Sequence, residues 1–380
     1  MNKVKMIIVG GFLGAGKTTL LARAAEELTR RGQKVGLITN DQAANLVDTE
    51  ILQQAGREVK EVAGACFCCA FNRLLYVCDQ LIGSFAPDVI IGEPVGSCTD
   101  LSATVLQPMK KLCRDIFDLS PYSVLIDPAS FMQNVAGGEA GGRQATGAGK
   151  ADSPGESQDE SVRYIYRKQI EEADLIVLNK LDTLSSQEAD GIKARVKAEF
   201  PGIPVSALSA ATGAGLAQWL DTILAGGKVG QRIAQVDYDT YAAGEAALGW
   251  LNAAVRLSSA GTINWKAFGV DLLQRVQMRL TAAGADIAHV KLLLSSGGQK
   301  LKIGLTSNTG QPSLQGSIAG ESRALLVVNA RVRIDPGDLR AVAERCLSES
   351  SGEAITAEIV EITSFSPSRP TPLHRFDSVL

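Results

Sequence analysis

The segment from Gly11 to Thr18 constrains the fold of this chain more than any other. It reads GFLGAGKT and fits the phosphate-loop pattern, in which four residues separate a first glycine from Gly-Lys-Thr. An apolar run, Lys5–Val9, precedes it, and a helical pattern, Thr19–Arg31, follows it. A loop between a strand and a helix presents backbone N–H groups at the positive end of the helix. The sequence therefore predicts a phosphate site.

Each residue type in this loop has a physical reason. Glycines leave the backbone N–H groups accessible to phosphate oxygens, because no side chain covers them. We expect Lys17 to bridge the outer phosphates as a catalytic residue and the Thr18 hydroxyl to ligate Mg²⁺. The predicted phosphate-binding residues are Gly11, Gly14, Ala15, Gly16, Lys17, Thr18 and Thr19.

The pattern around this loop predicts one large α/β domain over residues 1–228. Short apolar strands alternate with helix-length amphipathic stretches from Val4 to about Ala225, which is typical of βα units around a buried, mostly parallel sheet. The expected fold class is the doubly wound sheet of P-loop NTPases. The predicted strands are Lys5–Val9, Lys34–Thr39, Glu58–Val62, Val89–Gly92, Ser123–Asp127, Leu175–Asn179 and Ile203–Ala207.

Residues 137–160 interrupt this alternation of predicted strands and helices. They are rich in glycine, serine and small polar residues, with almost no large apolar side chains to offset the entropy cost of ordering. We therefore predict a flexible insertion, either without a role or functional.

A smaller second domain is expected over residues 240–365, after a polar link near Gly226–Thr240. The order of strands and helices predicts an α+β domain that is ferredoxin-like in outline. The tail, residues 366–380, contains three prolines and is expected to be extended. The predicted elements are strands Leu248–Leu257, Ile287–Leu294, Lys300–Thr306, Ala324–Ile334 and Ala354–Thr363, and helices Phe268–Ala283 and Pro336–Ser348.

A guanine-recognition pattern follows a later strand of the first domain. Asn179 and Lys180 precede Asp182, whose carboxylate can accept hydrogen bonds from the N1–H and the exocyclic amine of guanine. Adenine would leave that carboxylate unpaired, at a cost of about 1–3 kcal/mol or more. Lys180 would lay its stem across the base, and Ser209 and Ala210 are placed to supply a backbone N–H to the guanine carbonyl. GTP is the expected nucleotide.

Between the two motifs, a hydrophobic strand ends in Glu93. We expect this carboxylate to hold Mg²⁺ through water and Gly96 to offer its N–H to the γ-phosphate, the alternative for Glu93 being an ordinary acidic residue at a strand end. Asn40 and Asp41, beyond the second strand, are placed to touch Mg²⁺ or the attacking water. Ser97 follows Gly96, without an obvious glutamine to orient water or an arginine finger, so unaided hydrolysis should be slow.

Three cysteines within four residues form the second chemical feature. Cys66, Cys68 and Cys69 are too close for easy pairwise disulfides but suit convergence on one soft or borderline cation, Zn²⁺ or Co²⁺. The chain has two histidines, so thiolates must dominate the site. The alternative is three small buried packing residues. Cys98 is one candidate fourth ligand and equally a core residue; water, a substrate group or a partner protein are the others.

The overall composition narrows the classes of partner. The chain has 38 Lys+Arg against 41 Asp+Glu, a formal net charge of −3, which disfavours a nucleic-acid partner. The longest apolar runs are strand-sized, and no signal-peptide pattern is present. We therefore expect a cytoplasmic protein with no membrane partner. Cysteine clustering in such a chain favours metal or redox chemistry over structural disulfides.

These residues together resemble the CobW-like branch of the metallochaperone GTPases, relatives of HypB and UreG. The segments similar to that family are Gly10–Leu21, Asn40 and Asp41 with Asp48, Gly64–Cys69, Glu93–Gly96, Asn179–Asp182 and, more weakly, the C-terminal half around Ile287–Leu294. The chain departs from the family where Ala43 and Ala65 replace glycine and where a His-rich tract is missing. These departures concern the metal and the delivery target, not the nucleotide.

The resemblance implies a GTP-hydrolysing metallochaperone. Such a protein would bind a divalent metal at the Cys-x-Cys-Cys site in its GTP form and deliver it to a client metalloprotein or a cofactor-synthesis enzyme, as in cobalamin synthesis. The oligomeric state stays open, a homodimer included. The alternative is a GTP-gated chaperone or regulator of a metalloenzyme with a structural zinc. A metabolic kinase is a weaker third interpretation, because the guanine motif is present and the sequence indicates no pocket for a substrate that would accept the phosphate.

Overall fold

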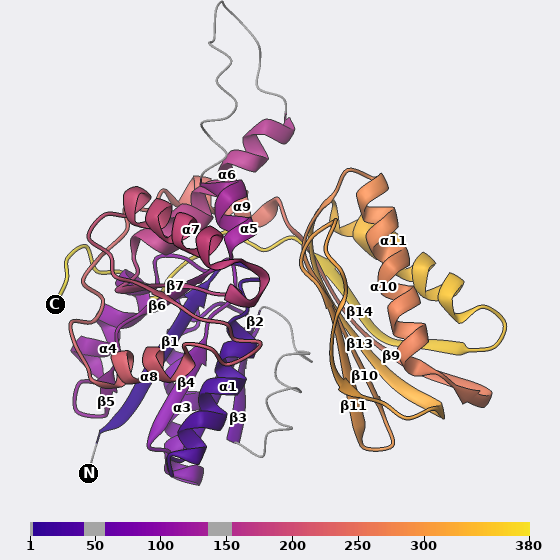
Figure 1. Ribbon diagram of the computed structural model, residues 1–380, viewed down its shortest axis with the longest axis horizontal. Coiled ribbons are helices and arrows are strands. Elements are labelled where there is room, and N and C mark those ends of the chain that lie inside the picture. Colours follow the sequence, from indigo (N-terminus) through magenta and orange to yellow (C-terminus); the bar gives the residue numbers. More distant parts are fainter. Residues whose placement is uncertain (1–2, 42–57, 136–153) are drawn as a thin grey trace, which may run out of the picture. The chain divides into compact units, whose positions relative to one another are not determined.

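The computed structural model describes residues 3–41, 58–135 and 154–380. It divides into two compact units. One unit contains Glu245–Arg369, and the other contains the described residues before Glu245 together with Pro370–Leu380 (Figure 1). The predicted switch residue Asp48 and residues 137–153 of the predicted insertion lie outside the described residues.

An eight-stranded parallel sheet forms the centre of the first unit, with strand order β3-β2-β4-β1-β6-β7-β8 and β5 beside β1. Every residue of β4 is buried, as expected for a sheet covered on both faces. The predicted doubly wound fold is therefore confirmed. The strands are β1 Val4–Gly11, β2 Val35–Asp41, β3 Glu58–Ala63, β4 Val89–Glu93, β5 Phe117–Leu119, β6 Ser123–Ile126, β7 Leu175–Leu178 and β8 Val205–Ala207.

Helices cover this sheet and share an apolar core with it (Figure 1). Leu20 and Leu21 of α1 and Trp219 of α8 are fully buried in one such core. The helices are α1 Lys17–Arg30, α3 Phe71–Phe85, α4 Gln107–Leu112, α5 Pro128–Asn134, α6 Pro154–Glu171, α7 Ser186–Glu199, α8 Leu216–Leu224 and α9 Tyr238–Ala246. Shorter turns are the π-helical η1 Ser102–Leu106 and the 3₁₀ turn η3 Leu181–Thr183.

The parallel sheet brings the predicted motifs to one edge. Ligands of open α/β sheets bind at the carboxyl ends of the strands, since all those ends point the same way. The phosphate loop follows β1, the cysteines follow β3, Glu93 ends β4, and Asn179 follows β7. The positions of these segments are thus set by topology before any side chain is considered.

The second unit is a six-stranded antiparallel sheet with two helices, in the strand order β12-β11-β10-β13-β9-β14. Strands β14, β9, β13 and β10 lie side by side in the 4-1-3-2 arrangement of a ferredoxin-like sheet, to which β11 and β12 add a hairpin. The elements are β9 Gly249–Ile263, α10 Trp265–Ala282, β10 Asp286–Ser296, β11 Gln299–Leu305, β12 Ser313–Ser317, β13 Glu321–Arg333, α11 Pro336–Ser351 and β14 Thr356–Phe365.

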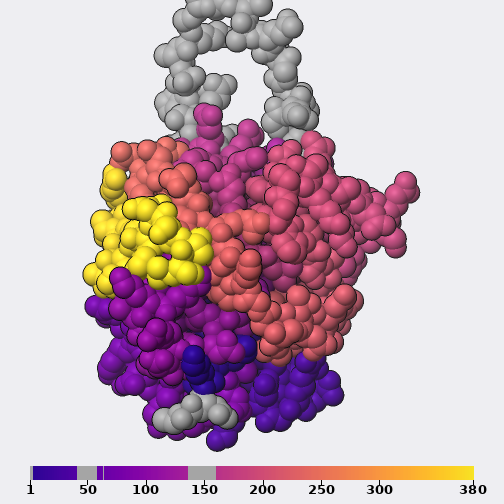
Figure 2. Space-filling model, turned by 90° about the vertical axis from the view of Figure 1, so that its left-hand side faces the viewer, coloured from indigo at the N-terminus to yellow at the C-terminus, as the bar shows by residue number. Residues whose placement is uncertain are grey.

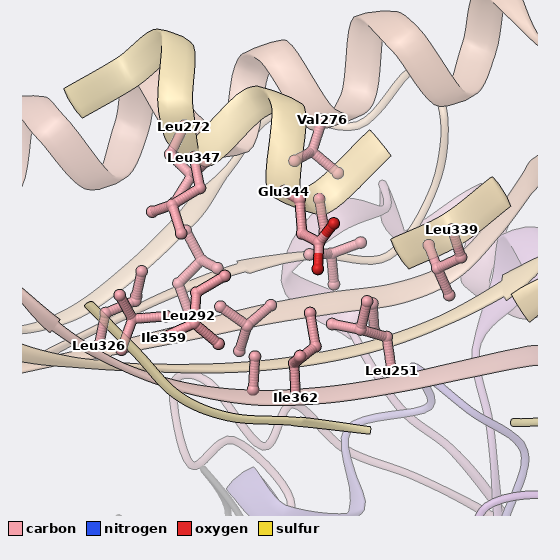
Figure 3. A pocket seen from close by; sticks show the side chains of 16 residues that line it. Leu251, Leu272, Val276, Leu292, Leu326, Leu339, Glu344, Leu347, Ile359 and Ile362 are labelled. Carbon is pink, nitrogen blue, oxygen red and sulfur yellow. The ribbon is translucent and has the colours of Figure 1, made fainter. Parts of the chain in front are cut away.

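The core of this unit lies between one sheet face and helices α10 and α11. It contains a small apolar cavity of about 30 Å³ (Figure 3). Leu251, Leu272, Val276 and Leu347 line it, and Glu344 is the single charged side chain among the lining residues.

Three local elements differ from the sequence predictions. Strand β12 has five exposed residues and offers no apolar alternation, and β5 spans only three residues. Helix α9 occupies part of a segment that we interpreted as a polar link. Helix α6 begins at Pro154, inside the predicted insertion, where the fixed φ of proline suits a first helical turn. Among the described residues, no helix has the length and apolar character needed to cross a membrane.

Candidate functional site

The phosphate loop runs from the end of β1 into the first turn of α1. Gly16 has φ 96°, and a Cβ at this position would lie 2.4 Å from Asn179 Nδ2. Gly11 has φ 129°, and its Cβ would lie 2.4 Å from the carbonyl oxygen of Leu125. Both the backbone angle and the space therefore require glycine at these two positions. Gly14 also has a positive φ, and Ala15 is buried.

The charged and hydroxyl groups of this loop are buried. The Lys17 ammonium donates to the carbonyl oxygens of Gly11, at 2.8 Å, and Phe12, at 3.2 Å. Thr18 Oγ1 donates to Glu93 Oε1 at 3.1 Å, which joins the start of α1 to the end of β4. A hydroxyl beside a carboxylate is an oxygen donor set that suits Mg²⁺. Thr19 follows in the first turn of α1 and is half-buried.

The turn after β4, which we call the Gly96 turn (Val95–Cys98), packs on the phosphate loop. A Cβ on Gly96 would lie 2.6 Å from Leu13 Cδ2, so a larger residue here would displace the Leu13 side chain. The buried side chain of Gln169, on α6, donates to the carbonyl oxygens of Gly96 and Cys98, both at 2.9 Å. Gln169 therefore holds both ends of the part of the turn that carries the predicted γ-phosphate contact.

The predicted base-recognition residues meet at the ends of β7 and β8. Asn179 Nδ2 donates to the carbonyl oxygen of Ala15 at 2.7 Å, and Asn179 Oδ1 accepts the Ala210 N–H at 2.9 Å. This side chain thus links the phosphate loop to the segment after β8. It also occupies the Ala210 N–H that the sequence suggested for the guanine carbonyl. The Ser209 hydroxyl donates to Asp182 Oδ1.

Lys180 adopts a left-handed backbone conformation with φ 60°. Its ammonium lies 3.3 Å from Asp127 Oδ2, and Asp127 also caps the N-terminus of α5 by accepting the Ala129 N–H. The lysine stem is thereby held beside the Asn179 and Asp182 segment.

The cysteine turn, residues 66–69, lies between β3 and α3. Cys66 and Cys68 are 3% and 2% exposed, and Cys69 is half-buried. The Sγ atoms are 2.7 Å apart for Cys66 and Cys68, 3.4 Å for Cys66 and Cys69, and 3.7 Å for Cys68 and Cys69. The three sulfurs converge on one point and form a candidate metal site.

A fourth sulfur approaches this cluster from the Gly96 turn. Cys98 Sγ lies 3.7 Å from Cys68 Sγ, and its side chain is 1% exposed. Cys78 and Cys113, by contrast, lie on or next to helices α3 and α4, and Cys346 lies on α11 in the second unit.

The cluster favours neutral thiols when no metal is bound. The hydrogen bond with the Cys66 thiol, together with burial, raises the pKa of Cys69 to about 11. Hydrogen bonds with the neighbouring thiols and burial raise the pKa of Cys68 well above its ordinary value. A metal that binds as a thiolate complex must therefore displace protons from these sulfurs.

Asn40 ties the end of β2 to the cysteine turn. Its Nδ2 donates to the carbonyl oxygens of Val62 and Ala65, both at 2.7 Å, and its Oδ1 accepts the Phe67 N–H at 2.8 Å. The sequence placed Asn40 near Mg²⁺ or the attacking water, whereas this side chain is engaged by the turn that bears the sulfurs. Strand β2 ends at Asp41, whose side chain lies outside the described residues.

The C-terminal segment, Pro370–Leu380, belongs to the first unit and forms the yellow patch on the face shown in Figure 2. Its backbone contacts the cysteine turn. The Thr371 N–H donates to Cys69 Sγ at 3.2 Å, and the Leu373 N–H donates to the carbonyl oxygen of Cys68 at 3.1 Å. The His374 ring packs edge-on against Phe71, with centroids 5.3 Å apart.

A buried ion pair anchors this segment. Arg375 Nε donates to Asp100 Oδ2 at 2.7 Å, and the Tyr238 hydroxyl donates to the same oxygen at 2.8 Å. Asp100 is fully buried. Burial raises the pKa of Asp100, although Tyr238 and Arg375 oppose that rise. The N–H of Phe376 donates to the carbonyl oxygen of Ala103 at 3.1 Å and extends the attachment.

The sequence did not predict three sets of contacts. These are the hydrogen bonds from Asn40 to the cysteine turn and its flanking residues, which we call the Asn40 bridge, those from Gln169 to the Gly96 turn, and those of the C-terminal segment. Gln169 carries no motif, because any helix can present a glutamine. The segment did contain a signal, since Leu373 and Phe376 are apolar residues in a proline-rich tail. An exposed extended tail has no need of either side chain.

Comparison with known proteins identifies the family. The profile described as CobW/HypB/UreG, nucleotide-binding domain, matches residues 5–236. Zinc chaperone CobW of Pseudomonas aeruginosa is 26% identical over 212 residues, which cover 53% of this chain and 55% of that protein. Zinc-regulated GTPase metalloprotein activator 1 of Dictyostelium discoideum is 23% identical over 217 residues, covering 52% of this chain and 44% of that protein. The chain spans about half the length of these curated relatives.

Solved structures with a resemblance include two proteins with metal in their descriptions. The Zn(II)-bound YjiA GTPase of Escherichia coli aligns with a TM-score of 0.38 and 16% identity, covering 91% of this chain and 99% of that one. HypB of Helicobacter pylori in complex with nickel aligns with a TM-score of 0.39 and 17% identity, covering 58% of this chain and 86% of that one. Since the family profile matches residues 5–236, more than half of the chain, this protein belongs to the CobW/HypB/UreG family.

Proposed function

We propose that this protein binds GTP with Mg²⁺, carries Zn²⁺ on Cys66, Cys68 and Cys69, and releases the zinc to a client protein when GTP is hydrolysed. Zn²⁺ is the cargo, and Co²⁺ is the second candidate because tetrahedral thiolate sites accept both ions. The names of the curated relatives, zinc chaperones CobW and YjiA, support zinc.

The observation that carries this proposal is the Asn40 bridge. The side chain at the end of β2 forms three hydrogen bonds with the segment that contains the cysteine turn. The next residue, Asp41, ends the same strand and is proposed to face Mg²⁺ or the attacking water. A change in β2 on loss of the γ-phosphate is therefore passed to the sulfurs through contacts between packed groups.

The phosphate-binding roles follow from the buried contacts of the loop. Lys17 would exchange the carbonyl oxygens of Gly11 and Phe12 for phosphate oxygens, which are stronger acceptors for an ammonium. Thr18 and Glu93 would hold Mg²⁺, which neutralises charge on the β- and γ-phosphates. The Gly96 N–H would contact the γ-phosphate.

Base selection would rest on Asp182, with Asn179 as a positioning residue. The Asp182 carboxylate is oriented by the Ser209 hydroxyl and would accept the N1–H and the amine of guanine. Asn179 holds the phosphate loop and the Ala210 segment together, so that the base and phosphate sites keep a fixed spacing. Lys180, held near Asp127, would cover one face of the base.

Hydrolysis would be slow without a partner. Water attacks the γ-phosphorus, GDP leaves, and the products are GDP and phosphate. Ser97 occupies the position after Gly96 and is fully buried, where a short hydroxyl cannot reach as far as the glutamine that orients water in faster GTPases. Asp41 is the proposed residue that orients this water.

Calorimetric titration of Zn²⁺ into the protein with a non-hydrolysable GTP analogue, with GDP and without nucleotide tests the proposal. A coupling free energy of about 1–3 kcal/mol would make zinc bind ~5–150-fold more tightly in the triphosphate form, and by linkage zinc would tighten GTP equally. Equal zinc affinity in all three states would contradict metal delivery. It would favour a structural zinc in a GTP-gated regulator of a metalloenzyme.

The chain provides a matched control for the site. Changing Cys66, Cys68 and Cys69 together to serine should abolish stoichiometric zinc binding while GTP still binds the metal-free protein. Changing the three remote cysteines, Cys78, Cys113 and Cys346, to serine should leave zinc binding in place. Retention of one zinc in the first variant would place the metal elsewhere.

A further inference from the structure

We propose that Cys98 is the fourth sulfur ligand, so that the cargo metal is held by four thiolates contributed by two separate segments. This inference rests on the proposed metal site and adds a residue to it. Cys66, Cys68 and Cys69 come from the cysteine turn after β3, and Cys98 comes from the Gly96 turn after β4.

The distance from Cys98 to its neighbour Cys68 suits a tetrahedral complex. Zinc–sulfur bonds of about 2.3 Å in a tetrahedron place the sulfurs about 3.8 Å apart. Cys98 Sγ and Cys69 Sγ each lie 3.7 Å from Cys68 Sγ, and Cys66 Sγ lies 3.4 Å from Cys69 Sγ. The shortest pair, Cys66 and Cys68 at 2.7 Å, would open by about 1 Å around an ion.

The backbone of Cys98 is fixed in position. Gln169 donates to its carbonyl oxygen at 2.9 Å, and the Cys98 N–H donates to the carbonyl oxygen of Val95 at 2.9 Å. Two hydrogen bonds on adjacent peptide groups restrain the Cα, so the sulfur is directed towards Cys68 without a change of fold. Cys98 Sγ thus meets the cluster at Cys68, and an ion bound there would draw it towards the other two sulfurs.

The proposed ligand also shortens the route from nucleotide to metal. Cys98 lies two residues after Gly96 and five after Glu93, on the turn that packs against the phosphate loop. A movement of this turn on γ-phosphate binding would displace one of the four ligands directly. The Asn40 bridge would act on the other three through the cysteine turn.

The charge of a four-thiolate site can be offset locally. Four thiolates around a divalent ion leave a net charge of −2, which burial disfavours. The Thr371 N–H already donates to Cys69 Sγ, and hydrogen bonds to ligating atoms of this kind stabilise metal complexes. Four sulfur ligands also favour zinc over Mg²⁺, which prefers oxygen.

X-ray absorption at the zinc edge of the protein incubated with Zn²⁺ counts the sulfur ligands directly. We expect four sulfurs at about 2.3 Å in the wild type, and three sulfurs with one oxygen or nitrogen in Cys98→Ser. A first shell of three sulfurs in the wild type would overturn the fourth ligand alone. Absence of bound zinc from the wild type would overturn the proposed function as well.

Cobalt provides an optical version of the same test. The sulfur-to-cobalt charge-transfer band should lose about a quarter of its intensity in Cys98→Ser and Cys98→Ala, because one of four thiolates is gone, and zinc affinity should fall at least ~10-fold. Serine keeps the side-chain size if alanine fails to fold. Cys78→Ala is the matched control, a buried cysteine on α3 whose removal should change neither quantity. An unchanged cobalt spectrum in both Cys98 variants would refute the assignment.

Discussion

The phosphate loop and the cysteine site are built in opposite ways. The loop is a contiguous stretch of eight residues whose ammonium is satisfied by its own carbonyl oxygens. The cysteine site is assembled from the cysteine turn, the Gly96 turn and the C-terminal segment. The first depends on local chain geometry, and the second depends on contacts between residues up to 302 positions apart. A local site tolerates changes elsewhere, whereas an assembled site responds to them.

This difference suits the proposed role of a metal carrier. A phosphate loop whose backbone is already formed before GTP arrives binds phosphate without a large ordering cost. A metal site whose residues come from several segments can open when one segment moves. Release of a tightly held ion requires such an opening. The four predictions below alter one region at a time and ask whether the other responds.

The largest expected effect is on the phosphate loop. Lys17→Ala should weaken GTP binding at least ~100-fold, since each hydrogen bond from a charged donor contributes about 1.5–3 kcal/mol and the ammonium would form several. Zinc binding to the nucleotide-free protein should be unchanged. Titration with a fluorescent GTP analogue measures the first quantity, with the exposed Lys197→Ala as control. A change below tenfold would show that the lysine does not bind phosphate.

The second effect concerns the C-terminal segment, which contacts the cysteine turn. Arg375→Ala should destabilise the docked C-terminal segment by about 2 kcal/mol, because the buried Asp100 carboxylate loses its charged partner and keeps the hydrogen bond from the Tyr238 hydroxyl. The segment should then detach more often and expose Cys69. The alkylation rate of Cys69, followed by mass spectrometry, should rise by about 30-fold, the equivalent of about 2 kcal/mol.

Asp377→Ala provides the control for that variant. Asp377 also pairs with Arg375, but it is 92% exposed, and a pair of this kind contributes about 0–1 kcal/mol. The alkylation rate of Cys69 in Asp377→Ala should equal that in the wild type. Equal rates in Arg375→Ala would mean that the ion pair does not hold the segment on the cysteines.

A smaller effect is expected at the base site. Asp182→Asn keeps an oxygen that accepts the guanine N1–H but replaces the other oxygen with an N–H donor that faces the guanine amine. GTP affinity should fall ~10–30-fold, the loss of one charge-assisted hydrogen bond. Xanthosine triphosphate has a carbonyl oxygen where guanine has the amine, so its affinity should rise. Competition titrations of the two nucleotides measure both changes. If the affinity for xanthosine triphosphate did not rise, Asp182 would not be the residue that contacts the base.

Much of the fold could be predicted from the sequence. Buried parallel strands are near-continuous apolar runs in the sequence. For that reason, the sequence predicted strands β1, β4 and β7. The ferredoxin-like outline followed from element order. The phosphate-loop and guanine motifs could also be placed, because each lies at the end of a legible strand and the parallel topology then brings those ends together.

The remaining features depend on tertiary contacts without a local signature. Strand β12 is polar and exposed, and it exists because β11 offers a free edge. The Asn40 bridge requires knowledge of how β2 and β3 pair. The C-terminal segment could be predicted as extended from its prolines, but its site on Asp100 depends on a buried charge whose partner lies 275 residues away.

The smallest predicted effect addresses the bridge between the two regions. Asn40→Ala removes two donated hydrogen bonds and leaves the Phe67 N–H without its acceptor, so the cysteine turn should lose its fixed geometry. Zinc affinity should fall about tenfold, in the range for residues that orient ligands. Asn40→Asp keeps the acceptor for Phe67 and should lose less. If the bridge transmits the nucleotide state, the ratio of zinc affinities between the triphosphate and diphosphate forms must shrink in Asn40→Ala. A lower affinity with an unchanged ratio would mean that Asn40 only supports the turn, and that the coupling runs through the Gly96 turn instead.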